Sequence, residues 1–432
     1  MIESNRLALS WDTVLLLILT MAHLWFNPIS SALVVLLLAV YVVLGWLIPK
    51  MPDETDAPRT RERLAFSIRL ASVLFILLIA ALLPTGWNIL QRHAQGPATH
   101  AHDGLLQTEA AIRFLLEGKN PYTENYLNTP MADFKGGEPP FTSAPLYHNA
   151  YLPFLFIGSI PFYLLSQATL GWYDQRFLYI LLYIGALLLL PQLVACQRDR
   201  LTMLITFGLN FLSTYFLAEG RNDVVVMFGL VLVTFLLACR WVSASAVVLG
   251  LVLTVKHSAW FFLPFYVVYL LPKPLTRSSA RILLLQMLPL FVVAAAILLP
   301  FLVWDTVSFL DDTVTYVTGA GPHSFPIKGW GLSTFLLAAG LIPSPEAAFP
   351  FDVLEVLFGF PTLLFLLVWQ WRENTLRQVW IGFAVFSFVV EFFSRFFSDN
   401  YVVFILQTLV IAAFMIPLRW DGVPPPSGVV RE

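Results

Sequence analysis

The sequence predicts an all-α protein, a polytopic bundle of transmembrane helices with further helices lying along its outer face. Hydrophobic residues make up 58% of the 432 residues and charged residues 12%, whereas soluble domains have about 45–50% apolar and about 25% charged residues. The mean hydropathy is +0.76. The apolar runs are continuous and rich in leucine, which is typical of membrane helices. Lipid is therefore the expected environment of most of the chain.

The charge balance argues against a nucleic-acid partner. The formal net charge is -2, and no dense basic run occurs. Nucleic-acid binding needs clustered Lys and Arg to neutralise phosphates. We therefore expect no nucleic-acid partner.

A helix needs about 20 apolar residues to cross the hydrocarbon core, and we expect about 11–13 membrane segments. The first run lacks a cleavage site after it and is interpreted as an anchor. The candidate segments are Trp11–Phe26, Ser31–Ile48, Leu64–Pro84, Tyr151–Ser166, Phe177–Ala195, Leu201–Ala218, Val224–Cys239, Ala244–Leu271, Ile282–Val303, Asp352–Trp371, Val379–Phe397 and Tyr401–Leu418.

Basic residues set the expected orientation. Connections rich in Lys and Arg, such as Lys50–Arg63, are expected in the cytoplasm, together with the C-terminus. Three polar stretches are then expected on the outer side: Thr85–His148, Glu219–Asp223 and Asp305–Glu346. This predicts a multi-pass protein of the cell (plasma or inner) membrane. The expected divisions are an N-terminal two-helix addition with a basic loop (1–63), a membrane domain (64–420) containing the extracytoplasmic loop 85–148, and a cytoplasmic tail (421–432).

Two segments are expected to depart from simple crossings. Tyr151–Ser166 contains Pro153 and Pro161, which disfavour a helix interior, so we expect it to dip in or lie along the outer face. Ala244–Leu271 is interrupted by Lys256. Two half-length helices meeting there would keep both basic flanks on one side.

The outer loop contains a predicted short helix, Gly104–Glu117, with Asp103 ahead of it. It is too short to span, so we expect its apolar face to lie in the lipid. Asp103 has two interpretations: a helix cap, or a general base at the membrane–water boundary.

The histidines near Asp103 raise the question of a metal. His100, His102 and Asp103 have the residue types of a metal site, and His93 and Glu109 could complete the set. Solvated loop histidines are the simpler interpretation. We therefore expect no cofactor, and a metal is not favoured.

The remaining candidates for functional residues are charged side chains in other parts of the chain. Arg221 and Asp223 belong to a polar turn that either caps a helix or lines the site opened by the outer loop; arginine suits bidentate phosphate contact. A lysine inside a spanning segment, as Lys256 is, marks a functional site by default. Glu391 and Arg395 are four residues apart and are expected to pair with each other.

The stretch Asp305–Glu346 contains Gly319–Gly331. Within it, His323 and Lys328 have side chains that could take part in binding or catalysis. Its glycines and prolines indicate a defined irregular loop. It is either a lid over a site or a packed surface loop.

In order and placement these motifs resemble the GT-C-fold, polyprenol-phosphate-dependent glycosyltransferases, and within them the mannosyltransferase-like group. The resemblance covers about residues 64–418. It is carried by Asp103 with the helix ending in Gly118-Lys119-Asn120-Pro121-Tyr122, by Gly220-Arg221-Asn222-Asp223, by Lys256 in its broken hairpin, and by the segment His323–Gly331. The paired acidic motif of metal-dependent members is absent around Asp103.

The resemblance implies a reaction and its residues. A mannose-like hexose or pentose would move from a polyprenyl-phosphate donor to a hydroxyl of a glycan, lipid or protein acceptor outside, with inversion. Asp103 would be the base, and Lys256 and Arg221 would face the lipid phosphate. The residues expected to contact substrate are Glu109, Tyr122, Asn222, Asp223, His257, His323 and Lys328.

Two other functions fit the composition. A polytopic transporter or lipid flippase without covalent chemistry would also need polar groups between membrane helices. A membrane scaffold protein would not need a charge inside a broken hairpin.

Overall fold

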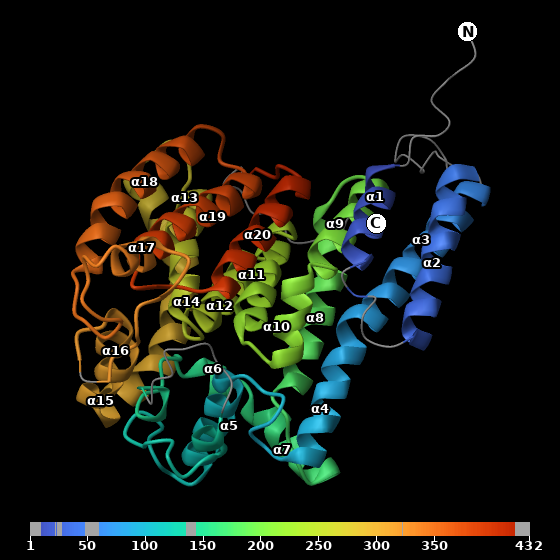
Figure 1. Ribbon diagram of the computed structural model, residues 1–432. Coiled ribbons are helices and arrows are strands. Elements are labelled where there is room, and N and C mark those ends of the chain that lie inside the picture. Colours follow the sequence, from blue (N-terminus) through green and yellow to red (C-terminus); the bar gives the residue numbers. More distant parts are fainter. Residues whose placement is uncertain are drawn as a thin grey trace.

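The computed structural model describes residues 10–21, 23, 28–47, 60–134, 144–321 and 323–419. About 75% of the structure is helical, which confirms the all-α class (Figure 1). The expected tail, 421–432, lies outside the described residues, as do Lys50 and Arg59 of the first basic connection.

The chain begins with helices that pack side by side. The elements are α1 (Trp11–Met21), α2 (Pro28–Leu47), α3 (Thr60–Leu77), a π-helical turn (Leu78–Leu82) and α4 (Leu83–Gln95). A buried carboxylate joins the first three helices: Asp12 accepts the Tyr41 hydroxyl at 2.6 Å and pairs with Arg69. The expected division between 63 and 64 falls inside α3, because that helix begins at Thr60.

Short helices then gather at one end of the molecule, at the bottom of Figure 1. They are α5 (Asp103–Leu116), two 3-10 turns (Pro130–Asp133 and Ala144–Leu146), α6 (Phe154–Ile157) and α7 (Ile160–Leu170). At 1.5 Å per residue, α7 is only about 16 Å long. The proline-containing segment therefore forms two helices, each too short to span by itself. The expectation that the segment does not cross the membrane stays a prediction.

The central helices follow. They are α8 (Arg176–Leu189), a 3-10 turn (Leu190–Leu193), α9 (Gln197–Gly208), α10 (Phe211–Glu219), α11 (Asp223–Ala238), α12 (Val242–Leu253), a 3-10 helix (His257–Phe262), α13 (Leu263–Leu270) and α14 (Arg277–Trp304). The expected run Leu201–Ala218 is not one straight helix: α9 and α10 meet at 51°, because Asn210 caps a new helix through Ser213 N.

The expected break at Lys256 is present. The chain leaves helical geometry between α12 and the 3-10 helix, and the segment before α6 covers the exposed carbonyls: Leu152 N donates to Val255 O at 3.1 Å and Phe154 N to Thr254 O at 2.9 Å. Backbone groups freed inside a membrane need such partners. These two bonds thus fix the backbone beside Lys256.

The last part completes the molecule. Its elements are α15 (Thr306–Leu310), a π-helical turn (Asp311–Thr315), α16 (Tyr316–Thr318), β1 (Lys328–Gly329), α17 (Leu332–Ala338), α18 (Phe351–Glu373), α19 (Leu376–Phe393), β2 (Phe396–Phe397) and α20 (Asp399–Phe414). The strands pair in parallel, Lys328 with Phe396.

Five helical stretches of the described chain are long and apolar enough to cross a membrane, or six if α9 and α10 form one span. The longest runs without a break from Thr60 to Gln95. The main core lies among α8, α11, α12, α13, α19 and α20 and includes the fully buried Trp380, whose indole nitrogen donates to Thr234 at 3.0 Å. The sequence predicted about 11–13 membrane segments, so fewer of the described helices than expected are long and apolar enough to span; the other apolar helices have 10–17 residues.

Candidate active site

Two polar turns distant in sequence lie against each other at the end that carries α5. His102 N donates to Glu219 O at 2.8 Å. The buried Arg176 joins the same turns, because one of its nitrogens donates to His100 O at 2.7 Å and to Ala218 O at 2.8 Å. The structure therefore brings the start of α5 beside the Glu219–Asp223 turn.

Asp103 is the first residue of α5, not its cap. His102 is the N-cap, its side chain accepting from Gly104 N, so the expected cap position is wrong by one residue. Asp103 Oδ1 accepts from Gly104 N at 2.6 Å and lies 2.7 Å from His102 Nδ1. Its Oδ2 has no hydrogen bond within the described residues, and the side chain is 29% exposed.

The environment of Asp103 favours its ionised form. Burial opposes the charge, but His102, Gly104 N and the more distant Arg221 together outweigh it and lower the pKa of Asp103. The carboxylate is therefore charged at neutral pH and keeps one oxygen for a further contact. That is the state a general base requires.

The apolar face of α5 packs on protein rather than on lipid. Leu105, Leu106, Ala110, Ala111 and Ile112 are almost fully buried. The expectation of a lipid-facing helix is wrong, because short helices and aromatic side chains of the outer layer cover it. Asp103 thus stands on a firmly packed element.

Tyr151 lies at the centre of the site. A Cβ on Gly104 would overlap its hydroxyl, so the phenol rests directly on the first turn of α5. Burial raises the pKa of Tyr151; the Asp103 carboxylate raises it further and the Lys256 ammonium opposes both. Asp103 and Lys256 therefore act on the same phenol, although 153 positions in the sequence separate them.

Lys256 is paired within the protein. Its Nζ donates to Asp223 Oδ1 at 2.7 Å, and the Asn400 amide donates to Asp223 Oδ2 at 2.7 Å. The ammonium also lies 4.8 Å from the centre of the Tyr401 ring. The side chains of Lys256 and Asp223 are 12% and 17% exposed. Three separate elements meet at this pair.

Arg221 is paired too. It donates to Glu219 at 3.0 Å and to Asp399 at 2.7 Å, and its guanidinium lies 3.9 Å from the centre of the Phe216 ring. Including Asp103, the described cluster holds four carboxylates and two cations. Neither cation is free of acidic partners, so a phosphate would have to share or replace them.

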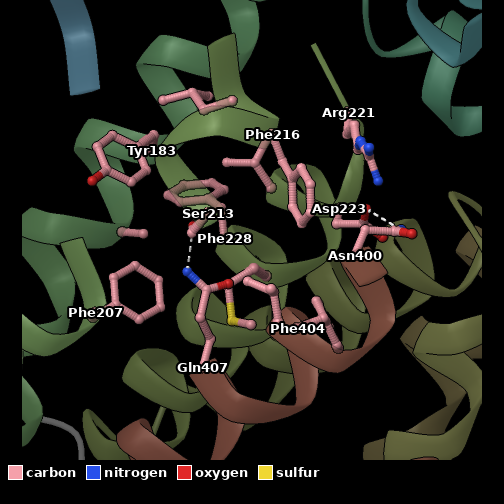
Figure 2. A pocket seen from close by; sticks show the side chains of 15 residues that line it. Tyr183, Phe207, Ser213, Phe216, Arg221, Asp223, Phe228, Asn400, Phe404 and Gln407 are labelled. Carbon is pink, nitrogen blue, oxygen red and sulfur yellow. Dashed lines mark hydrogen bonds between the residues drawn. The ribbon is translucent and has the colours of Figure 1, made fainter. Parts of the chain in front are cut away.

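A narrow cavity of about 40 Å³ opens beside these residues (Figure 2). Arg221, Asp223 and Asn400 form its polar end, as Figure 2 shows. Most other lining residues are apolar side chains of α8, α10, α11 and α20. The polar cluster therefore lies at one end of a small, mostly apolar cavity between the helices.

Two expected substrate contacts have structural roles. Glu109 binds Arg92 through both oxygens at 2.7 and 2.8 Å and accepts from Gln175 N at 2.9 Å. Tyr122 is 3% exposed, and its hydroxyl donates to Tyr151 O at 2.8 Å. Neighbours already engage both groups, and their expected substrate contacts stay predictions. Within the protein, Tyr122 holds the Tyr151 backbone.

Asn222 and His257 border the cluster. Asn222 is 4% exposed and lies beside the Tyr151 hydroxyl. His257 follows Lys256 directly, with its ring centre 4.8 Å from that of Trp260. The structure places both near the site and leaves their expected substrate contacts as predictions.

The second outer stretch contributes less than expected. His323 is exposed and stacks on Tyr147, with ring centres 4.6 Å apart. Lys328 belongs to β1. Arg395 does not pair with Glu391; it donates to the carbonyls of Phe325, Pro345 and Ala347 at 2.5–2.9 Å. Arg395 therefore holds this stretch in place.

The histidines considered as metal ligands do not form one group. His93 stacks on Trp172 and His100 bonds to Gln95 at 3.1 Å. Within the described residues, the ligand atoms of His148, Asp311 and Asp312 do lie within 4.8 Å of one another. Asp312 accepts from Asn149 N at 2.8 Å and contacts His148 Nδ1 at 2.8 Å, so these groups join the outer segments. The adjacent aspartates were the only sequence signal for this contact.

Comparison with protein-family models, with curated protein sequences and with solved structures gave no match to this chain.

Proposed function

We propose that this protein is a membrane glycosyltransferase that moves a sugar from a polyprenyl-phosphate donor to an acceptor hydroxyl. The observation that supports it most is the convergence on Tyr151. A carboxylate with an unused oxygen, Asp103, and a cation, Lys256, both act on this phenol. Asp223, the partner of Lys256, forms part of the polar end of an apolar cavity.

The chemistry is an inverting displacement. Asp103 accepts the proton of the acceptor hydroxyl as its oxygen attacks the anomeric carbon. The bond from that carbon to the phosphate oxygen breaks on the opposite face, and the polyprenyl phosphate leaves with the electron pair. Cations near the leaving oxygens stabilise the transition state. Lys256 and Arg221 are the candidates for that role.

Phosphate binding must compete with carboxylates that already hold these cations. Lysine has three donors and arginine five, so each can hold a phosphate oxygen as well as a carboxylate. Asp399 is 41% exposed, whereas its partner Arg221 is 15% exposed. We expect the phosphate to enter beside Asp399 and weaken that pair.

The apolar cavity is the proposed path of the polyprenyl chain. It is narrow as it stands, so the chain must displace flexible lining residues such as Met227. A lipid chain between α10, α11 and α20 would hold its phosphate beside Arg221. On this proposal the fold is a GT-C-like membrane domain, with the site outside the cell membrane and the C-terminus in the cytoplasm.

The stereochemistry of the product tests the mechanism. Purified protein is given polyprenyl-phosphate sugars, mannose first, with a panel of glycan, lipid and peptide acceptors, and the anomeric configuration of the product is read by NMR. We expect a product inverted relative to the donor. A retained configuration would contradict a single displacement assisted by Asp103.

One observation favours a second candidate, a transporter or flippase. The pairs Lys256–Asp223 and Arg221–Asp399 link separate elements, and such links can break and reform when a gate opens. This function predicts movement of labelled lipid across proteoliposomes without a covalent product. Donor consumption by the purified protein would instead support the transferase.

A further inference from the structure

A second cavity lies on another side of α5 and plays no part in the proposed transfer step. It is a groove of about 280 Å³ formed by the end of α4, by α5, by α7 and by the segment after α7. These elements lie together at the bottom of Figure 1. This volume is close to the lower end of small-molecule sites, about 300 Å³. We therefore expect a small occupant, of one or two rings.

The lining differs in kind from that of the apolar cavity. Among the described residues, no leucine, isoleucine, valine, phenylalanine or methionine lines it. Its surface combines aromatic rings with polar and charged side chains, including Tyr163, Trp172, Gln167 and Arg113. Aromatic faces carry partial negative charge and attract the C–H groups of a sugar ring, while polar groups bond its hydroxyls. An acyl chain would find no matching surface here.

Arg113 gives the groove its charge preference. It is half-buried and has no hydrogen bond or ion pair from its guanidinium to any described residue. Glu117, the C-cap of α5, is bonded to Lys119 at 2.7 Å and feels Arg113 only as a weaker, more distant charge. Two carboxylates, Glu109 and Asp174, also line the groove, but both are held at 2.7–2.9 Å by its other arginine, Arg92. Arg113 is therefore the cation ready to bind an anion.

We propose that this groove binds an acidic saccharide, with its carboxylate or phosphate on Arg113 and its ring against Tyr163 and Trp172. Guanidinium groups bind such anions through paired hydrogen bonds. Binding needs no donor lipid. Asp103 and Arg113 are ten residues apart on one helix, or about 15 Å. If the proposed function holds, an acidic acceptor glycan seated here would reach Asp103 within a few sugar units.

The test is binding to the purified full-length protein in detergent. The probes are glucuronate, galacturonate and glucose 6-phosphate, with glucose as the neutral control, followed by saturation-transfer NMR up to millimolar concentrations. We expect at least one acidic probe to bind and glucose to bind at least about tenfold more weakly.

Substitutions of Arg113 test whether the acidic probes bind in this groove. Arg113→Gln should weaken acidic binding about tenfold, Arg113→Lys should weaken it less, and Arg372→Gln, the same change on an exposed arginine of α18, should leave it unchanged. Asp103→Asn should also leave it unchanged, so failure of the transfer reaction does not affect this result.

Three outcomes would overturn the proposal. They are no binding of any acidic probe, equal binding of glucose, and equal binding by Arg113→Gln and the unaltered protein. The same variants are also tested with vesicles of anionic and zwitterionic phospholipid. Arg113-dependent binding of anionic vesicles without saccharide binding would assign the groove to a lipid headgroup instead.

Discussion

At the scale of single residues, the pair of Lys256 and Asp223 is the contact of the site that we expect to be most destabilising to break. Both side chains are largely buried, and removing one partner of such a pair leaves the other charge unpaired. We expect Lys256→Met to lower the free energy of unfolding by about 3 kcal/mol and to weaken donor binding. The double variant Lys256→Met with Asp223→Asn should recover most of the stability and none of the donor binding.

Thermal unfolding and donor titration of the same preparations measure the two effects separately. Recovery of donor binding in the double variant would remove Lys256 from the proposed phosphate site.

His102 gives a pH prediction at the same scale. It lies 2.7 Å from Asp103 and helps to lower the pKa of that carboxyl. A base works only when ionised, so transfer should fall as the pH drops through this lowered value. Replacing His102 by Gln removes the imidazole that helps to lower the pKa of Asp103, and the acidic limb of the pH–rate profile should move to higher pH. An unmoved limb would mean that another group controls it.

The helix α5 carries the next prediction, at the scale of elements. Alanine in place of glycine normally stabilises a helix by about 0.5–1 kcal/mol, and Gly86→Ala in α4 should do so because nothing lies within 4 Å of the added Cβ. Gly104→Ala should instead push Tyr151 away. We expect transfer to fall at least about tenfold. Equal activity of the two variants would show that Tyr151 need not rest on α5.

Local elements were predictable and long-range pairing was not. The spacing of apolar residues predicted both ends of α5 to within one residue. The lysine inside an apolar run predicted the break in the helix at Lys256. Sequence reasoning missed Tyr151, because a lone tyrosine in a segment with two prolines has no pattern of its own. It also missed the pairing of Glu109 with Arg92 and Gln175, since these partners lie 17 and 66 residues away.

At the scale of the whole molecule, a buried network is among the contacts that join the N-terminal helices to the rest. Asp12 holds both Tyr41 and Arg69, and α1 packs against α9. We expect Asp12→Asn to destabilise this region by about 3–5 kcal/mol, seen as faster hydrogen exchange in α1 and α2. Tyr41→Phe, which removes one hydroxyl, should cost about 1 kcal/mol.

Transfer activity should survive both changes, because the candidate site contains no residue of α1 or α2. Loss of activity without loss of fold in Asp12→Asn would contradict the idea that these helices are an addition to the catalytic domain.

Donor consumption by Asp103→Asn beside the unaltered protein is the most direct test of the proposed transferase. Purified protein receives the polyprenyl-phosphate sugar panel with acceptors, and mass spectrometry follows each donor. Asp133→Asn, an exposed aspartate of the same outer loop, is the matched control. We expect one donor to be consumed by the unaltered protein and the control, and at least about a hundredfold more slowly by Asp103→Asn. Equal consumption by Asp103→Asn, or no consumption of any donor by the unaltered protein, would contradict the proposal.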